Sequence, residues 1–257
     1  MHKVLEIHDL DFTYHTLSGE TKAIQNISFD VYENEFLGII GPSGSGKSTI
    51  LSLIFGLLTP TSGTITIDQR PSESEETDIG YMLQKDHLFE WRSIYKNIML
   101  GLEIRHQITN EKKQLINQLL NDYGLTAFKD ARPSQLSGGM RQRVALIRTL
   151  ALQPKMLLLD EPFSALDAQT RLSVADDIYK ILRKEHKSSI LVTHDISEAI
   201  SFCDRIIVLT KRPGTVKNII PIQLSIPEKT PLKARNAPEF RKYFNELWEE
   251  LHDESQI

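Results

Sequence analysis

One segment of the sequence combines glycines, hydroxyls and a lysine at the spacing of a phosphate-binding loop. It is Gly41-Pro42-Ser43-Gly44-Ser45-Gly46-Lys47-Ser48-Thr49. Glycines let backbone N–H groups turn inward around a polyphosphate without side-chain clashes. A helix that begins here aims its positive end at the anion, while Lys47 adds a charge at the terminal phosphates and Ser48 can ligate Mg²⁺. Residues 41–49 are therefore expected to bind a nucleotide polyphosphate.

Two carboxylates follow the apolar run of residues 156–159 and supply a second chemical motif. In phosphoryl transfer, one such carboxylate lies near the metal and the other near the terminal phosphate. Asp160 is expected to hold Mg²⁺ through water, and Glu161 to accept a proton from the attacking water. Alone, the pair is only moderately specific, because an exposed strand end or the charges of a helix N-terminus would have the same residues. Its combination with the phosphate-binding loop favours nucleotide hydrolysis.

A third motif joins a Ser-Gly-Gly turn to the start of a helix, in the segment Leu136-Ser137-Gly138-Gly139-Met140. Its free N–H groups and hydroxyl could bind an anion, although an ordinary helix N-cap would have the same residues. About ninety residues separate this turn from the phosphate-binding loop. A head-to-tail dimer is the natural way to bring two such phosphate-binding elements onto one nucleotide.

Hydrophobic periodicity predicts the elements that position these motifs. Short apolar runs predict strands, and apolar residues at helical spacing predict helices. A helical insert of roughly sixty residues interrupts an α/β frame, and an aromatic stripe over residues 240–251 predicts a last helix, docked on its own domain or contacting another subunit. We expect strands at residues 4–14, 24–32, 36–40, 64–68, 79–83, 156–160, 190–193 and 205–210, and helices at 50–58, 93–102, 110–123, 141–152, 168–185 and 197–202.

The composition is that of an ordinary globular protein. Among 257 residues, 30 Lys and Arg oppose 34 Asp and Glu, giving a formal charge of -4, which argues against binding nucleic acid through bulk charge. No apolar stretch approaches the ~20 residues that a membrane-spanning helix requires, and the N-terminus lacks the pattern of a signal peptide. The single cysteine, Cys203, fits a reducing compartment and is expected to be a small buried hydrophobic residue.

Taken together, the motifs resemble the nucleotide-binding subunit of an ATP-binding cassette (ABC) transporter, over essentially the whole chain. The resemblance implies an α/β fold: a P-loop NTPase cassette with a RecA-like α/β core, an antiparallel β subdomain and a helical subdomain. It implies one ATP-binding domain over residues 1–257. Within it we expect the α/β core at 1–86 and 154–225, the helical subdomain at about 87–153 and a C-terminal helical tail at about 226–257.

Further site residues follow from this resemblance alone. Tyr14 resembles the aromatic residue that stacks on adenine, and Gln84 the glutamine that touches Mg²⁺ and couples to the membrane subunit. His194 resembles the residue that contacts the γ-phosphate. Ser164-Ala165-Leu166-Asp167 resembles the D-loop, which crosses the dimer, and residues 136–140 the signature that contacts the partner's ATP. Taken singly, each has an ordinary interpretation, namely a core or surface aromatic, a solvated strand end, a structural histidine or a helix N-cap.

Three details are similar to importers of the nitrate, sulfonate and taurine type. Met140 stands where glutamine is commonest, Trp91 follows Gln84, and Arg212-Pro213-Gly214 occurs near the end of the frame. The substitution at 140 leaves Ser137 and its two glycines intact, so ATP contact is expected to remain. Trp91 is either a packing aromatic or lines a groove for the transmembrane subunit.

The resemblance also implies partners and a location. Two cassettes, identical or paired, would enclose two ATP molecules with Mg²⁺, driving a permease and indirectly serving a solute-binding protein. The chain would lie peripherally on the cytoplasmic side of the cell membrane, without nucleic acid. Two alternatives stay open: a non-transport ABC ATPase acting in DNA repair, chromosome organisation or ribosome work, and a cassette that regulates a membrane complex.

Overall fold

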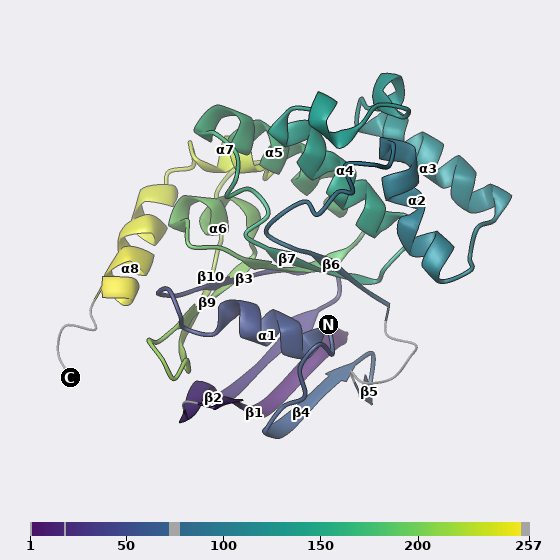
Figure 1. Cartoon of the computed structure of the whole chain (residues 1–257). Helices are drawn as coiled ribbons and strands as arrows, with labels where there is room; N and C mark the ends of the chain where they lie inside the picture. Colours follow the sequence, from purple (N-terminus) through teal and green to yellow (C-terminus); the bar gives the residue numbers. More distant parts are fainter. Residues whose placement is uncertain (1, 18, 72–77, 253–257) are drawn as a thin grey trace.

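A computed structural model describes residues 2–17, 19–71 and 78–252, and it contains two sheets with helices on both faces of the larger one (Figure 1). The strands are β1 (Lys3–Thr16), β2 (Gly19–Tyr32), β3 (Phe36–Ile40), β4 (Ser62–Ile67), β5 (Arg70–Pro71), β6 (Ile79–Met82), β7 (Met156–Asp160), β8 (Ser188–Val192), β9 (Arg205–Leu209) and β10 (Val216–Pro221). The α-helices are α1 (Lys47–Ile54), α2 (Ile94–Ile104), α3 (Asn110–Asp122), α4 (Gly138–Leu150), α5 (Ala168–Lys184), α6 (Ile196–Phe202), α7 (Pro231–Ala234) and α8 (Phe240–His252). Two short 3₁₀ helices, η1 (Thr126–Phe128) and η2 (Pro133–Gln135), precede α4.

The larger sheet has the strand order β10-β9-β3-β8-β7-β6. Its strands from β9 to β6 run parallel, and β10 pairs with β9 in the antiparallel sense. Every residue of β3, β7 and β8 is buried, which explains their continuous apolar sequences, since a parallel sheet is covered on both faces. The carboxyl ends of β3, β6, β7 and β8 therefore meet at one edge, where ligands bind in such sheets.

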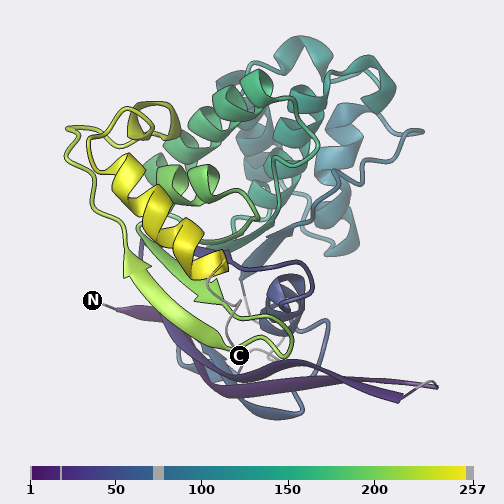
Figure 2. The same ribbon diagram turned by 90° about the vertical axis from the view of Figure 1, so that its left-hand side faces the viewer.

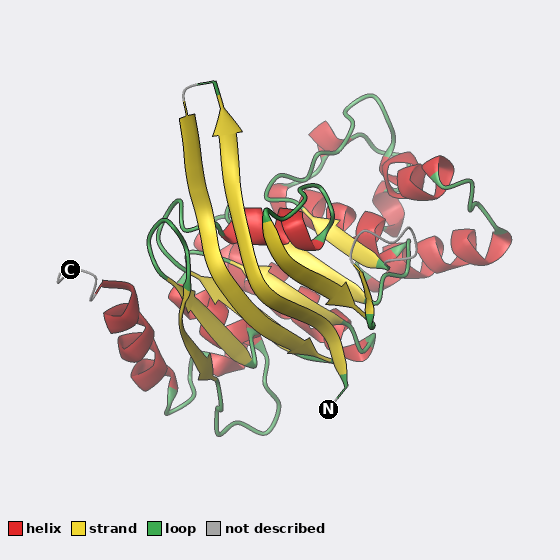
Figure 3. Ribbon diagram, turned by 90° about the horizontal axis from the view of Figure 1, so that it is seen from below, coloured by secondary structure: helices red, strands yellow, loops and turns green. Residues whose placement is uncertain are grey.

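The smaller sheet is antiparallel, with the order β2-β1-β4-β5, and its long β1–β2 hairpin projects past the rest of the molecule (Figure 3). Helix α1 lies between the two sheets (Figure 1). One hydrophobic cluster joins these layers, because Ile27 of β2, Ile39 of β3 and Leu51 of α1 are all fully buried in it. This packing fixes the helix that follows the phosphate-binding loop.

The helical insert shares a second core with the opposite face of the large sheet. Ile98 of α2, Leu146 of α4 and Phe36 of β3 belong to one buried cluster. Ser93 and Thr109 cap α2 and α3 by accepting hydrogen bonds from the backbone N–H groups three residues later. The expected α/β layout with an antiparallel sheet and a helical part is confirmed.

The C-terminal helix α8 lies beside α6 and β9 (Figure 2). Leu247 is fully buried, and Phe240, Tyr243, Phe244 and Leu251 pack against the main core. The aromatic stripe is thus docked on its own domain, although Trp248 remains half exposed. The last residues of the expected tail, 253–257, lie outside the described residues.

Several element ends differ from those expected. Helix α1 stops at Ile54 rather than residue 58, because Gly56 adopts a positive φ of 79° and ends the helix. Helix α4 begins three residues earlier than expected, at Gly138, since Ser137 caps it. Strand β10 and helix α7 were not expected. Among the described residues, no helix is both long and apolar enough to span a bilayer.

Candidate nucleotide-binding site

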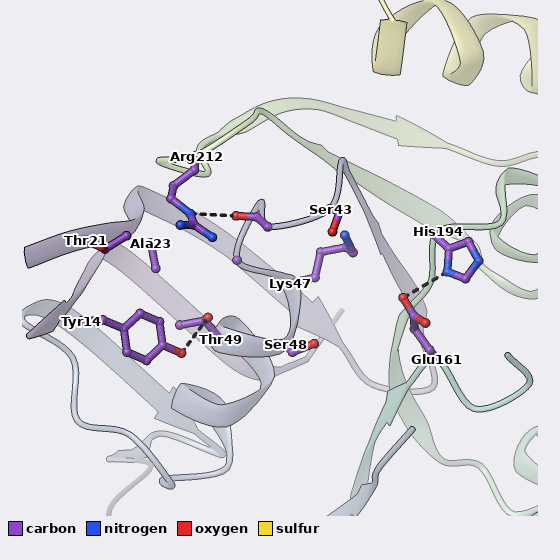
Figure 4. A pocket seen from close by; sticks show the side chains of 12 residues that line it. Tyr14, Thr21, Ala23, Ser43, Lys47, Ser48, Thr49, Glu161, His194 and Arg212 are labelled. Atoms are coloured by element: carbon purple, nitrogen blue, oxygen red, sulfur yellow. Dashed lines mark hydrogen bonds and ion pairs between the residues drawn. The ribbon is translucent and has the colours of Figure 1, made fainter. Parts of the chain in front are cut away.

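A cavity of about 380 Å³ opens between the P-loop, the β1–β2 hairpin and the carboxyl ends of β7 and β8 (Figure 4). This volume lies within the range of small-molecule sites. Of the residues predicted to bind the nucleotide or act on it, nine line the cavity: Tyr14, Ser43, Gly44, Gly46, Lys47, Ser48, Thr49, Glu161 and His194. Thr21, Ala23 and Arg212 complete the wall.

The conformation of the P-loop depends on Gly46, which precedes α1 with φ 91°. A Cβ atom there would lie 2.3 Å from Ile24 Cγ2, so only glycine lets the loop pack on β2. The eight-residue helix α1 then starts at Lys47, with its N-terminus at the loop.

The Lys47 ammonium donates to the carbonyls of Gly41 at 2.8 Å and Pro42 at 3.0 Å. Burial lowers the pKa of Lys47, while the negative charges of Glu161 and Asp160 oppose this shift. The ammonium is therefore partly desolvated, and in such surroundings its charge attracts an anion more strongly than in water.

Asp160 ends strand β7 directly opposite the start of α1. Its Oδ1 accepts a hydrogen bond from the Ser48 hydroxyl at 3.2 Å, and its Oδ2 accepts one from the Tyr81 hydroxyl at 3.3 Å. Burial raises the pKa of Asp160. Burial, and then the Asp160 charge, also raises the pKa of Tyr81 to about 12, so the phenol stays a donor. The pair Ser48 and Asp160 thus presents oxygen atoms in the manner that Mg²⁺ prefers.

Glu161 is held from two sides by other predicted site residues. Its Oε1 lies 3.1 Å from His194 Nδ1, and its Oε2 accepts a hydrogen bond from Gln84 Nε2 at 3.0 Å. The three residues come from the ends of adjacent strands β6, β7 and β8. Glu161 has φ 45°, an unusual value for a residue other than glycine, and such strain persists where the surroundings enforce it.

Tyr14 stands at the opposite end of the cavity, on β1 (Figure 4). Its hydroxyl lies 3.1 Å from Thr49 Oγ1, and its ring meets Phe12 edge-on with centroids 4.8 Å apart. The side chain is 40% exposed, so a ring face remains available for a flat ligand. Tyr14 and Glu161 thus stand on either side of the P-loop, as a bound nucleotide with its base at one end would require.

Two predicted segments lie outside this cavity in the described chain, namely residues 136–140 and 164–167. Ser137 caps α4, accepting a hydrogen bond from Met140 N at 3.4 Å, and Asp167 caps α5, accepting one from Thr170 N at 3.0 Å. The ordinary capping interpretation therefore holds for both residues, and it leaves their role toward a partner as a prediction. Leu136 is buried.

Sequence reasoning missed Arg212 and Tyr81 as parts of the site. The Arg212 guanidinium donates to the Gly44 carbonyl at 3.4 Å, which places a cation at the rim of the P-loop. Its neighbour Gly214 packs so closely on the loop that a Cβ atom would lie 2.0 Å from the Ser45 carbonyl oxygen. The motif Arg212-Pro213-Gly214 was noted in the sequence as a resemblance to one group of importers, but no local sequence pattern predicted that it contacts the P-loop. Trp91, in turn, packs against Phe89 with ring centroids 4.6 Å apart, yet 72% of its surface stays exposed.

Comparisons with known proteins agree with this geometry. The family model described as ABC transporter matches residues 24–164. The chain is 44% identical to the uncharacterized ABC transporter ATP-binding protein YtlC of Bacillus subtilis, over 96% of this chain and 95% of that protein. It is 40% identical to the nitrate import ATP-binding protein NrtD of Synechocystis sp., over 95% of this chain and 93% of that protein.

Among solved structures, a dimeric ATP-binding cassette in a post-hydrolysis state with ADP and Pi superposes with a TM-score of 0.73 and 31% identity. The match covers 85% of this chain and 99% of the cassette. The P-loop, the Asp160–Glu161 pair and these relatives all lead to one assignment. The chain belongs to the ABC transporter family, resembles its nitrate-type ATP-binding subunits, and is an ATPase.

Proposed function

We propose that the chain powers the uptake of a small solute, of the nitrate, sulfonate or taurine kind, through a separate permease. The observation that carries the ATPase part is the placement of Glu161 between Gln84 and His194, beside the P-loop. The likeness to a nitrate import protein supports the direction of transport and the class of solute. The nitrate transport protein NasD of Klebsiella oxytoca, 36% identical over 88% of this chain, supports the same class.

The proposed reaction is the attack of water on the γ-phosphate of ATP, giving ADP and phosphate. Positioning and charge neutralisation supply most of the catalysis in such transfers. Glu161 accepts the proton of the attacking water, and His194 holds both that carboxylate and the terminal phosphate. Lys47 and the backbone of residues 41–46 bind the phosphates, with Ser48 and Thr49 at the start of α1. Tyr14 stacks on the adenine.

The donor set fits a magnesium ion. Ser48 and Asp160 already lie within hydrogen-bond distance of each other, and both offer oxygen ligands. The side-chain amide of Gln84 donates a hydrogen bond from Nε2 to Glu161, so its Oε1 is the atom that suits a cation. We propose these three residues as the Mg²⁺ site. The bound ion would neutralise phosphate charge during transfer.

Two copies are proposed to complete two sites. Residues 136–140 form the start of α4, whose positive end can attract an anion, and they do not line the cavity of their own chain in the described residues. A second cassette, facing the first head to tail, would bring them onto its partner's ATP, and residues 164–167 would lie along the same interface. The solved dimeric cassette supports this arrangement.

The remaining partners follow from the family. We propose a transmembrane permease that docks on the chain at the cytoplasmic face of the membrane, and a solute-binding protein that acts through the permease. The division into a core (1–86 and 154–225), a helical subdomain (about 87–153) and a tail (about 226–257) is part of this proposal. We propose that the exposed ring of Trp91, tilted by 35° against Phe89, lies where the permease docks.

The test is transport by the assembled complex. The chain is co-purified with a candidate permease, reconstituted in vesicles with a candidate solute-binding protein, and supplied with ATP on the cassette side. We expect uptake of nitrate, a sulfonate or taurine that stops with Glu161→Gln. Hydrolysis by a chain that captures no multi-span membrane protein and supports no uptake would favour a non-transport ATPase instead.

A further inference from the structure

Arg171, on the first turn of α5, connects the loop of residues 164–167 with the turn that carries His194. Its Nη2 donates to the Leu166 carbonyl at 3.1 Å, inside the loop of residues 164–167. Its Nη1 lies 3.5 Å from Asp195 Oδ2, in the turn that carries His194. A single guanidinium therefore contacts both the backbone of one loop and a side chain of the other.

Asp195 follows His194 directly and caps helix α6. Its Oδ1 accepts a hydrogen bond from Glu198 N at 3.1 Å, so Oδ2 is the oxygen that faces Arg171. Glu198 N and Arg171 thus hold the Asp195 carboxylate from two directions, one at each oxygen. The carboxylate next to His194 is therefore fixed in part by Arg171.

Thr193 fixes the other side of His194. Its hydroxyl accepts a hydrogen bond from Asp195 N at 3.1 Å and donates to Glu198, a carboxylate that is 8% exposed. The Arg171 and Glu198 side chains line the same small hollow on the surface of α5 and α6. The turn is thus bound at Thr193 and at Asp195, while His194 between them reaches Glu161.

We propose that Arg171 is a positioning residue, which ties the loop of residues 164–167 to the turn that carries His194. The inference rests on the proposed function, in which residues 164–167 face a second cassette. Arrival of that cassette displaces or fixes the Leu166 carbonyl. Arg171 passes this change through Asp195 to His194, and so to the orientation of the Glu161 carboxylate. Hydrolysis thereby depends on the partner.

The test compares steady-state ATP hydrolysis by wild type, Arg171→Gln, Arg171→Lys and Asp195→Asn. Arg171→Gln loses the charge and the fork that spans both loops, so kcat is expected to fall about tenfold or more while KM stays within about twofold. Arg171→Lys keeps the charge but has no fork, and it should recover part of kcat. Asp195→Asn remains a good helix cap and should fold while losing the pairing with Arg171.

Two further measurements separate positioning from simple damage. The double variant Arg171→Gln/Asp195→Asn should lose no more activity than the worse single variant, because both changes break one connection. In the Glu161→Gln background, Arg171→Gln should leave the Kd for ATP unchanged, since Arg171 lies outside the cavity. The matched control is Lys180→Gln, which removes an ion pair with Asp176 farther along the same helix.

Three results would overturn the inference: a kcat for Arg171→Gln equal to that of Lys180→Gln, additive losses in the double variant, or a rise in KM that accounts for the whole loss. If the wild-type chain hydrolyses no ATP under conditions where it is folded, the proposed function fails instead. The two failures are therefore distinguishable.

Discussion

Glu161 and His194 meet across the ends of two neighbouring strands, with Glu161 Oε1 and His194 Nδ1 3.1 Å apart. The second oxygen of Glu161 is held from the other side by Gln84, which follows β6. Because β7 lies between β6 and β8, the sheet itself brings the three side chains together. The carboxylate is oriented before any substrate arrives, which is the condition for efficient proton transfer.

Glu161→Gln should bind ATP but hydrolyse it about 10²–10⁴-fold more slowly, because an amide keeps the shape and cannot accept the proton. Bound ATP should then hold two cassettes together, which size-exclusion chromatography with light scattering detects. Glu249→Gln, a change on the outer face of α8, serves as the control. Turnover within a few-fold of wild type would contradict the role of Glu161.

Lys47→Ala should weaken ATP binding by roughly 10- to 100-fold, since hydrogen bonds to charged groups contribute about 1.5–3 kcal/mol. Isothermal titration calorimetry measures the Kd directly. The control is Lys242→Ala, which removes an exposed cation on α8. An unchanged Kd would place the nucleotide somewhere other than the P-loop.

Tyr14→Ala should raise the Kd for ATP and for ADP by similar factors, because both nucleotides carry the same base. Stacking of a base on an aromatic ring contributes about 1–3 kcal/mol. Tyr14→Phe keeps the ring and loses only the hydroxyl contact with Thr49, so it should bind almost as wild type does. Fluorescence titration with a labelled nucleotide compares the three proteins, and equal losses for Phe and Ala would exclude stacking.

Arg212→Ala should weaken ATP binding by up to about fivefold, since exposed charges at a rim contribute about 1 kcal/mol at most. AMP, which has fewer charges, should be affected less than ATP. The difference should shrink as the salt concentration rises, because exposed charges are screened. An equal effect on ATP and AMP at all salt concentrations would show that Arg212 supports the loop and does not attract the phosphates.

Glu198→Gln should change how stability depends on pH. Burial raises the pKa of Glu198 to about 7 from its usual 4.5, with Asp195 adding to the rise and Thr193, Arg171 and His194 opposing it. Between these two pKa values the folded state keeps a proton that the unfolded state has lost. The stability that the protonated Glu198 contributes, about 1.4 kcal/mol per pKa unit, is therefore lost as pH rises from 4.5 through 7.

Calorimetry of both proteins between pH 5 and 8 checks the direction of this effect. The glutamine variant has no proton to lose, so its Tm should rise relative to that of wild type as the pH increases. A difference in Tm that stays flat across this range would mean that Glu198 is already ionised throughout the folded state.

The sequence predicted the parts of the fold that local pattern determines. The continuous apolar runs at β3 and β7 have the bounds that were expected, and Lys47, Asp160 and Glu161 follow them by spacing alone. Strand β10 could not be found this way, because its edge position leaves Val216 and Ile219 only partly buried and its pattern weak. Helix α7 has four residues, too few to show a period.

The side chains that sequence reasoning missed are those whose roles depend on tertiary contacts. Tyr81 reaches Asp160 across two paired strands, and Arg171 spans two loops that lie 29 positions apart at Leu166 and Asp195. No local signal marks such residues, because any strand accepts a tyrosine and any helix surface an arginine. Their partners are known only once the sheet order is known.

Gly214 has a consequence for mutational tolerance. Its N–H donates to the Ala23 carbonyl at 2.9 Å, its carbonyl accepts from Gln25 N at 2.9 Å, and its α-carbon fills the space beside Ser45. Strand β2 and the P-loop are therefore packed directly against the turn at 214, which lies far from both in the sequence. In a saturation library, Gly214 should therefore be as intolerant of side chains as Gly46, although it lies far in sequence from the nucleotide-binding motifs.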